Sequence, residues 1–173
     1  MAPAGPPSDD DLTDAARRLG DSLRAHGARL ATAESATGGL IGHVVTQNAG
    51  SSDYYAGGVV AYANDVKARL LDVPDALIAS RGAVSAEVAS AMASGAMERL
   101  ACDIAVAVTG IAGPDGGSAE KPVGLTYLAV ARRGRGDASV ARHVWPHDRD
   151  GNKRASALAA LELTAHVMTS DGD

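Results

Sequence analysis

The sequence predicts a three-layer α/β/α domain built on a mixed sheet. Amphipathic helical segments alternate with short apolar segments along the chain, which is typical of a sheet covered by helices on both faces. In the segment 103–108, the residues after Asp103 form an uninterrupted apolar run, as in strands that are buried on both faces. The last two strands, near 123–131 and 138–145, are joined by the short polar stretch 132–137. A hairpin therefore ends the sheet and makes it mixed.

The first half of the chain predicts helices that alternate with two strands. In order, we expect a helix from Ser8 or Asp9 to Gly27, a strand over 29–34, a helix over 37–47, a turn over 48–52, a strand over 57–63 and a helix from Asn64 to Pro74. Ser8 and Asp9 are suitable N-caps because their side-chain oxygens accept hydrogen bonds from the first helical turn. Pro74 ends the last of these helices because proline lacks the amide hydrogen that a helix needs.

The second half predicts three strands between two helices. A helix begins after Ser85, with apolar residues at helical spacing from Val88 to Leu100. The strand 103–108 and a glycine-rich loop over 110–124 come next, before the hairpin. A final helix carries apolar residues from 155 to 168.

Length and composition predict one globular domain. The 173 residues are 46% hydrophobic and 21% charged, and no repeat or linker divides them. We expect a disordered tail over 1–9 and a single domain over 10–169. Aromatic residues make up 3% of the chain and phenylalanine is absent, so the core should consist of small side chains with helices close to the sheet.

Charge and cysteine content limit which binding partners and which cellular compartment we expect for the protein. A net charge of −5 and a pI near 5.5 argue against nucleic-acid binding, which needs a basic face. Cys102, the single cysteine, lies in an apolar context and is interpreted as a small buried hydrophobe. The N-terminus has no apolar segment of a secretory signal, and no run has the length of a membrane span. We expect a cytoplasmic protein without a membrane partner, and its oligomeric state, a homodimer included, stays open.

Ser35 occupies the junction where the strand over 29–34 gives way to a helical pattern. A serine at a helix N-terminus has unpaired backbone amides beside it, and these can stabilise the oxyanion that forms when a hydroxyl attacks a carbonyl. The alternative is an ordinary N-cap, for which serine and threonine are preferred in any protein.

Lys67 follows the second strand and is a candidate base for Ser35. A lysine in a partly buried site has a lowered pKa and can lose its proton, and a neutral amine can then accept the hydroxyl proton of serine. The alternative is a solvated surface charge.

The glycine-rich loop over 110–124 has more glycine than a tight turn needs. Glycine lets the backbone approach a ligand closely and direct amides at it. The loop lacks both the phosphate-loop and the dinucleotide patterns. Ser118 and Lys121 match the Ser-x-x-Lys spacing of penicillin-binding enzymes, but Pro122 prevents the helix on which that pair depends.

Taken together, these segments resemble the C-terminal domain family of the competence/damage-inducible protein CinA. The resemblance covers about residues 10–168 in one order and without a gap. It rests on Ala33–Gly39, Tyr62, Asn64, Lys67, Gly82–Ser85, Thr109–Gly117, Lys121–Gly124, Asp148 and Arg149. Two positions depart from the family pattern, since Ala36 replaces the usual cysteine and His147 the usual glycine.

The resemblance implies a five-stranded mixed sheet and an amidohydrolase activity. Stand-alone members of the family hydrolyse the carboxamide of nicotinamide mononucleotide to nicotinate mononucleotide and ammonia, a step of pyridine nucleotide salvage. Carried over to this chain, the nucleophile is Ser35, its base is Lys67, and Tyr62 relays the proton or holds the lysine.

The mechanism that follows assigns further residues. Backbone amides of Thr37, Gly38 and Gly39 are expected to stabilise the oxyanion. The glycine loop closes over the nucleotide, and a guanidinium suits a phosphate because it binds in a bidentate manner. The expected substrate-binding residues are Thr109, Gly110, Ile111, Ala112, Gly113, Lys121 and Arg149.

No cofactor or metal is expected. Asp148 and Asp150 lie beside basic residues, an arrangement more typical of a surface ion-pair cluster than of a metal site. The expected partner is a small nucleotide substrate. Two other functions remain open: a nucleotide-binding or protein-interaction module without turnover, and a Ser-Lys amidase for another small amide.

Overall fold

The computed structural model describes residues 5–170, which form helices and strands in the predicted alternation. In chain order the elements are α1 (Asp9–Ala25), β1 (Leu30–Glu34), α2 (Leu40–Thr46), η1 (Ser51–Asp53), β2 (Tyr55–Val60), α3 (Asn64–Leu71), α4 (Asp75–Arg81), α5 (Ala86–Arg99), β3 (Ile104–Gly110), β4 (Leu125–Arg132), β5 (Ser139–Val144) and α6 (Arg149–Thr169). Ser8 caps α1 in a reciprocal capping box with Asp11. Of the predicted tail, residues 1–4 lie outside the described residues, and Asp9 already belongs to α1.

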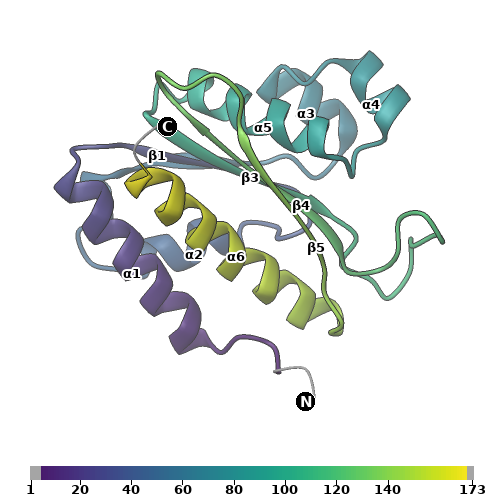
Figure 1. Cartoon of the computed structure of the whole chain (residues 1–173), viewed down its shortest axis with the longest axis horizontal. Helices are drawn as coiled ribbons and strands as arrows, with labels where there is room; N and C mark the ends of the chain where they lie inside the picture. Colours follow the sequence, from purple (N-terminus) through teal and green to yellow (C-terminus); the bar gives the residue numbers. More distant parts are fainter. Residues whose placement is uncertain (1–4, 171–173) are drawn as a thin grey trace.

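One five-stranded mixed sheet spans the described chain, in the order β2-β1-β3-β4-β5. The pairs β1–β2 and β1–β3 are parallel, whereas β3–β4 and β4–β5 are antiparallel. Figure 1 shows helices on both sides of this sheet. The predicted three-layer α/β/α fold is confirmed, and the sheet is mixed because the final hairpin adds its strands antiparallel.

The two helical layers have separate cores. Helices α1, α2 and α6 pack on one face, and α3, α4 and α5 pack on the other. Small residues bring helices into close contact, as expected from the scarcity of aromatics. A methyl group added to Gly95 of α5 would lie 1.9 Å from the Leu71 carbonyl oxygen of α3, so only glycine fits there. Cys102 is fully buried, as predicted, and burial raises the pKa of its thiol.

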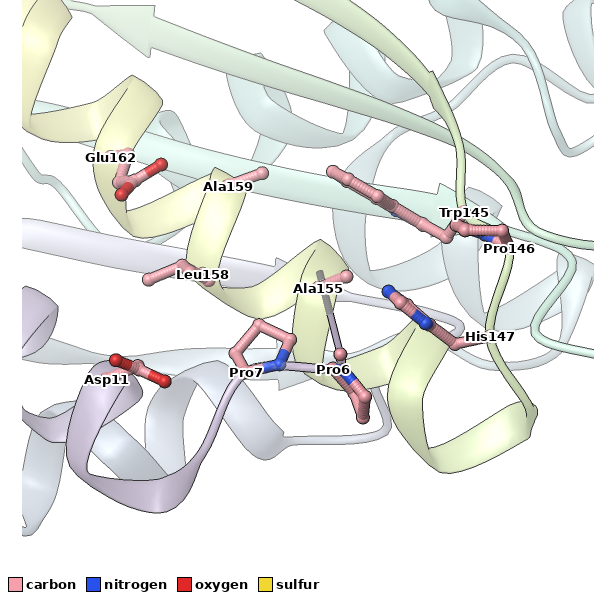
Figure 2. A pocket seen from close by; sticks show the side chains of 11 residues that line it. Pro6, Pro7, Asp11, Trp145, Pro146, His147, Ala155, Leu158, Ala159 and Glu162 are labelled. Atoms are coloured by element: carbon pink, nitrogen blue, oxygen red, sulfur yellow. The ribbon is translucent and has the colours of Figure 1, made fainter. Parts of the chain in front are cut away.

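A hollow of about 510 Å³ lies where the N-terminal segment meets α6 (Figure 2). Trp145 and Leu158 supply much of its apolar lining, and Pro6 and Pro7 form another wall. The carboxylates of Asp11 and Glu162 lie at its edge. Its lining has no serine and no lysine.

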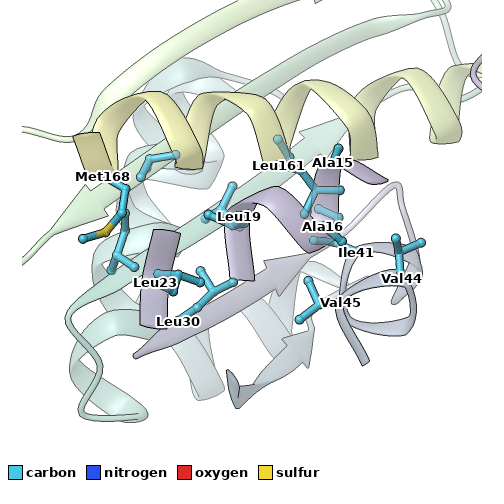
Figure 3. Packing of buried hydrophobic residues seen from close by; sticks show 14 of the residues in the cluster. Ala15, Ala16, Leu19, Leu23, Leu30, Ile41, Val44, Val45, Leu161 and Met168 are labelled. Atoms are coloured by element: carbon cyan, nitrogen blue, oxygen red, sulfur yellow. The ribbon is translucent and has the colours of Figure 1, made fainter. Parts of the chain in front are cut away.

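Beside this hollow, the core between α1, α2 and α6 consists of aliphatic side chains (Figure 3). Leu19 and Leu23 of α1 face Leu161 and Met168 of α6, and Leu30 of β1 lies beneath them. The packing fixes α6 over the sheet. The first turn of α6 therefore lies near the end of β1.

Two predicted elements start at other residues in the structure, and one helix was not predicted. Helix α2 begins at Leu40 and not near residue 37, because residues 36–39 form a turn. Strand β2 begins at Tyr55, two residues before the predicted start. After Pro74 the chain forms α4, which the sequence analysis missed, since proline suits the start of a helix as well as its end. No helix among residues 5–170 is long and apolar enough to cross a membrane.

Candidate active site

The carboxyl ends of β1 and β3 open into a small cavity. These two strands are neighbours, yet the chain leaves β1 through α2 on one face and reaches β3 through α5 on the other. Such a switch point is where open α/β sheets bind their ligands. The cavity holds about 190 Å³. Its lining consists of Ser35, Ala36, Tyr62, Asn64, Lys67, Ala83, Val84, Thr109, Gly110, Ala112 and Arg149.

Ser35 and Lys67 meet at the floor of this cavity. The Lys67 Nζ lies 3.1 Å from the Ser35 Oγ, within hydrogen-bond distance. Only 1% of Lys67 is exposed to solvent. Ser35 is placed by the end of β1, and Lys67 by the first turn of α3, so two neighbouring strand ends bring the pair together. The surface-charge interpretation of Lys67 is wrong.

The surroundings of Lys67 suit a neutral amine. Burial lowers the pKa of its ammonium, because the charged form loses the stabilisation of water. Besides Ser35, its Nζ has two neighbours, the carbonyl oxygens of Ala61 at 2.9 Å and Tyr62 at 3.0 Å. The ammonium has three hydrogens and can donate one to each of these three oxygens. Once deprotonated, the amine keeps two hydrogens for the carbonyls, and its lone pair can accept the hydroxyl hydrogen of Ser35.

The N-terminus of α2 is occupied by a carboxylate from the chain itself. Glu34, 2% exposed, accepts hydrogen bonds from the amides of Gly39, Ile41 and Gly42 at 3.0, 3.1 and 2.8 Å. The expectation that Ser35 lies at a helix N-terminus is wrong, because the helix starts five residues later and its amides bind Glu34. The sequence analysis missed Glu34, although a carboxylate at the end of a buried strand needs donors.

Two of the three predicted oxyanion amides already have acceptors. The Gly38 amide donates to the Ser35 carbonyl at 3.0 Å, and the Gly39 amide to Glu34. These two expectations are corrected. For the Thr37 amide no hydrogen bond is found within residues 5–170, and its assignment to the oxyanion stays a proposal.

Tyr62 contributes its backbone, not its phenol, to the lysine. Its carbonyl oxygen holds Lys67, whereas its hydroxyl accepts a hydrogen bond from the Arg149 Nη2 at 3.2 Å. The side chain is 61% exposed. Within the described chain the phenol has no hydrogen bond with either Ser35 or Lys67, so a proton relay through Tyr62 is not supported.

Arg149 closes the cavity from the side of α6. Its Nη1 donates to the Gly113 carbonyl at 2.7 Å while its Nη2 reaches Tyr62. Asn152, one turn later, donates to the Ala112 carbonyl at 3.0 Å. The sequence analysis did not single out Asn152, which is buried and fixes the glycine loop against α6.

The predicted substrate-binding residues divide into three groups. Four of them line the cavity: Thr109, Gly110, Ala112 and Arg149. Gly113 does not line the cavity, but its carbonyl oxygen accepts a hydrogen bond from Arg149, which does. Ile111 and Lys121 do not line it: Ile111 pairs with Gly124 and Leu125 as an extension of the sheet, and the Lys121 ammonium donates to the Arg81 carbonyl at 2.7 Å.

The lining has basic but no acidic side chains, although the chain as a whole carries a net charge of −5. Asp148 caps α6 through the Gly151 amide, and Asp150 pairs with Arg154 at 2.8 Å. The predicted ion pairing is therefore confirmed for Asp150, whereas Asp148 acts as the N-cap of α6 and forms no ion pair within residues 5–170. Among residues 5–170 no group of three or more metal-ligating side chains was found.

The fold and the site define an α/β domain that carries a serine–lysine pair at the switch point of its sheet. The chain belongs to the CinA C-terminal domain family, whose model matches residues 12–168. The predicted resemblance is confirmed.

Relatives and solved structures agree with this assignment. A CinA-like protein from Geobacter sulfurreducens is 51% identical over 163 residues, which cover 94% of this chain and 38% of the relative. A CinA-like protein from Salinibacter ruber is 52% identical, over 87% of this chain and 36% of the relative. The chain thus spans little more than a third of these relatives.

Solved structures of similar length show the same fold. The competence/damage inducible protein CihA from Agrobacterium tumefaciens is 40% identical and superimposes with a TM-score of 0.86, over 96% of this chain and 99% of that one. A CinA superfamily protein from Escherichia coli, 28% identical, gives the same TM-score over 95% and 94%.

Proposed function

We propose that this protein hydrolyses the carboxamide of nicotinamide mononucleotide to nicotinate mononucleotide and ammonia, a step in pyridine nucleotide salvage. The observation that carries the proposal is the 3.1 Å contact between Ser35 and a buried lysine that has no carboxylate beside it in the cavity lining. Burial disfavours the charge of a lysine that serves only the structure. The same burial favours a general base, because it promotes the neutral amine, whose lone pair can accept a proton.

In the first half-reaction Ser35 Oγ attacks the carboxamide carbon and Lys67 accepts the hydroxyl proton. The negative charge that develops on the carboxamide oxygen is stabilised by backbone amides of the turn after Ser35, with Thr37 as the candidate donor. The carbon–nitrogen bond then breaks. Lys67 returns its proton to the leaving nitrogen, which departs as ammonia and leaves an acyl-enzyme.

In the second half-reaction water attacks the ester carbon of the acyl-enzyme. Lys67 accepts a proton from the water and returns one to Ser35 Oγ as the ester bond breaks. Through both steps the Ala61 and Tyr62 carbonyl oxygens keep the amine of Lys67 oriented toward Ser35. The product is a carboxylic acid, which ionises at neutral pH.

The charges of the site favour an anionic substrate. Arg149 lines the cavity, and no carboxylate does. Two of the five guanidinium hydrogens bind Gly113 and Tyr62, which leaves three for a ligand. A nucleotide supplies the anion through its phosphate, whereas a simple amide supplies none.

The test is the release of ammonia from nicotinamide mononucleotide, with nicotinamide riboside and free nicotinamide as controls. We expect turnover of the mononucleotide and slower turnover of the two smaller amides. Equal rates on all three would indicate a general Ser-Lys amidase. Tight binding of the mononucleotide without any ammonia release would contradict the proposal and support a binding module.

A further inference from the structure

We propose that Lys153 binds the substrate phosphate together with Arg149 and thereby sets the preference for a nucleotide over its nucleoside. This inference rests on the proposed function and deepens it. Arg149 and Lys153 are four residues apart on α6, so their side chains leave the same face of the helix about 6 Å apart along its axis. Arg149 closes the cavity, and Lys153 lies one turn beyond it.

Lys153 reaches the turn that carries the nucleophile. A methyl group added to Gly38 would lie 4.0 Å from the Lys153 Nζ, and Gly38 is only three residues from Ser35. Gly38 is exposed and Lys153 half-buried, so the ammonium lies at the rim of the site and not inside it. A ligand that extends from Ser35 across the turn at Gly38 comes close to Lys153.

The ammonium of Lys153 forms no ion pair in the described chain, whereas Arg154 and Lys121 both have partners. None of the ion pairs within residues 5–170 includes it. The adjacent Arg154 is held by Asp9 at 2.6 Å and by Asp150 at 2.8 Å. Lys121 donates to the Arg81 carbonyl. Of the chain's three lysines, Lys67 faces Ser35, Lys121 holds a loop, and Lys153 is available to an anion.

The size of the cavity places the phosphate outside it. Ligand sites commonly measure about 300–1,000 Å³, whereas this cavity holds about 190 Å³, enough for a nicotinamide ring but not for a whole nucleotide. Arg149 also borders a second hollow, of about 470 Å³. Asp148 and Asp150 line that hollow, and their carboxylates repel a phosphate. Neither carboxylate pairs with Lys153, because Asp148 caps α6 through the Gly151 amide and Asp150 pairs with Arg154.

The experiment compares kcat/KM for nicotinamide mononucleotide and nicotinamide riboside in Lys153→Met, Lys153→Arg and the matched lysine variant Lys121→Met. A hydrogen bond to a charged group contributes enough that its loss lowers kcat/KM by about tenfold or more. We expect Lys153→Met to show that loss on the mononucleotide and less than about a twofold loss on the riboside. Lys153→Arg should keep the preference, and Lys121→Met should affect both substrates by the same factor.

Calorimetric binding of ribose 5-phosphate, with ribose as control, provides a readout that needs no turnover. We expect Lys153→Met to weaken ribose 5-phosphate binding and Lys121→Met to retain it. If the wild-type protein releases no ammonia but shows this pattern, the phosphate site stands and the proposed reaction fails. If Lys153→Met leaves both the mononucleotide kinetics and ribose 5-phosphate binding unchanged, or lowers both substrates equally, the inference about Lys153 is overturned.

Discussion

The two walls of the cavity are held in different ways. On the β1–α3 wall, Ser35 and Lys67 are buried. The Lys67 Nζ contacts two backbone carbonyl oxygens and the hydroxyl of Ser35. On the α6 wall, Arg149 is exposed and donates one hydrogen bond to the Gly113 carbonyl and one to the exposed hydroxyl of Tyr62. Burial controls protonation, whereas exposure keeps a charge solvated and its side chain movable.

Under the proposed function, this difference assigns chemistry to one wall and recognition to the other. A neutral lysine requires desolvation, which the β1–α3 wall supplies. Phosphate recognition requires permanent charges, and the α6 wall carries them. Substitutions in the buried wall should therefore lower the rate for every substrate, and substitutions in the exposed wall should lower it selectively for the nucleotide.

The largest effect is expected for Ser35→Ala. Removal of the nucleophile should lower kcat by on the order of 10⁴ or more. Substrate binding should persist, because the hydroxyl forms little of the binding surface. Ammonia release and calorimetric binding of the mononucleotide measure the two quantities. Retention of more than a few per cent of wild-type turnover would require a directly activated water in place of the acyl-enzyme.

Next in size is the effect of Lys67. The loss of a general base lowers the rate by about 10²- to 10⁴-fold. Lys67→Arg should be nearly as damaging as Lys67→Ala, because arginine keeps the charge and does not deprotonate. Since burial lowers the pKa of Lys67, the amine is protonated at low pH, and the wild-type rate should rise with pH through a value below that of an ordinary lysine. A pH-independent rate, or an active arginine variant, would assign Lys67 to electrostatics.

Glu34→Gln should act on the buried wall from a distance. Glutamine replaces one acceptor oxygen with an NH₂ group. This donor would face backbone amide donors that the Glu34 carboxylate now accepts hydrogen bonds from, so the turn should shift. A displacement of the Ser35 turn by about 1 Å lowers kcat by about 10²-fold. We expect a fall in kcat with KM nearly unchanged and with equal losses on the mononucleotide and the riboside. A selective loss on the mononucleotide would place Glu34 in recognition instead.

The sequence predicts the buried wall better than the exposed one. The order of the elements follows from hydrophobic periodicity, and Ser35 and Lys67 both lie at strand ends, which meet at one edge of the sheet. The start of α2 does not follow, because residues 36–39 take their conformation from a carboxylate that precedes them. To predict where α2 starts, one must know that the Glu34 side chain points at the amides of Gly39 and Ile41.

Surface charges are harder to place from sequence. Lys121 and Lys153 are both lysines beside loops or helix starts, and periodicity does not distinguish them. The difference arises because the glycine loop folds toward Arg81 whereas α6 packs across the sheet toward Gly38. Likewise, the Tyr62 phenol points to Arg149, a residue 87 positions away. Long-range packing decides such contacts, and local sequence does not record it.

Arg149→Ala sharpens the contrast on the exposed wall. It removes a charged donor, so kcat/KM for the mononucleotide should fall by about 10- to 100-fold, with little change for the riboside. The same comparison of two substrates measures it. Equal losses would show that the contact between Arg149 and Gly113 holds the loop in place and that the phosphate is bound elsewhere.

The smallest effect is expected for Tyr62→Phe, which separates the two walls at the residue that joins them. Its carbonyl oxygen belongs to the buried wall and its hydroxyl to the exposed one, and the substitution removes only the hydroxyl. Because solvent screens this exposed contact, it should contribute about 1 kcal/mol or less, so the loss in kcat/KM should stay below about tenfold and be confined to the mononucleotide. The pH profile should not move, because the Lys67 contacts are unchanged. A loss comparable with that of Lys67→Ala on both substrates would instead mean that the phenol swings inward and transfers the proton during turnover.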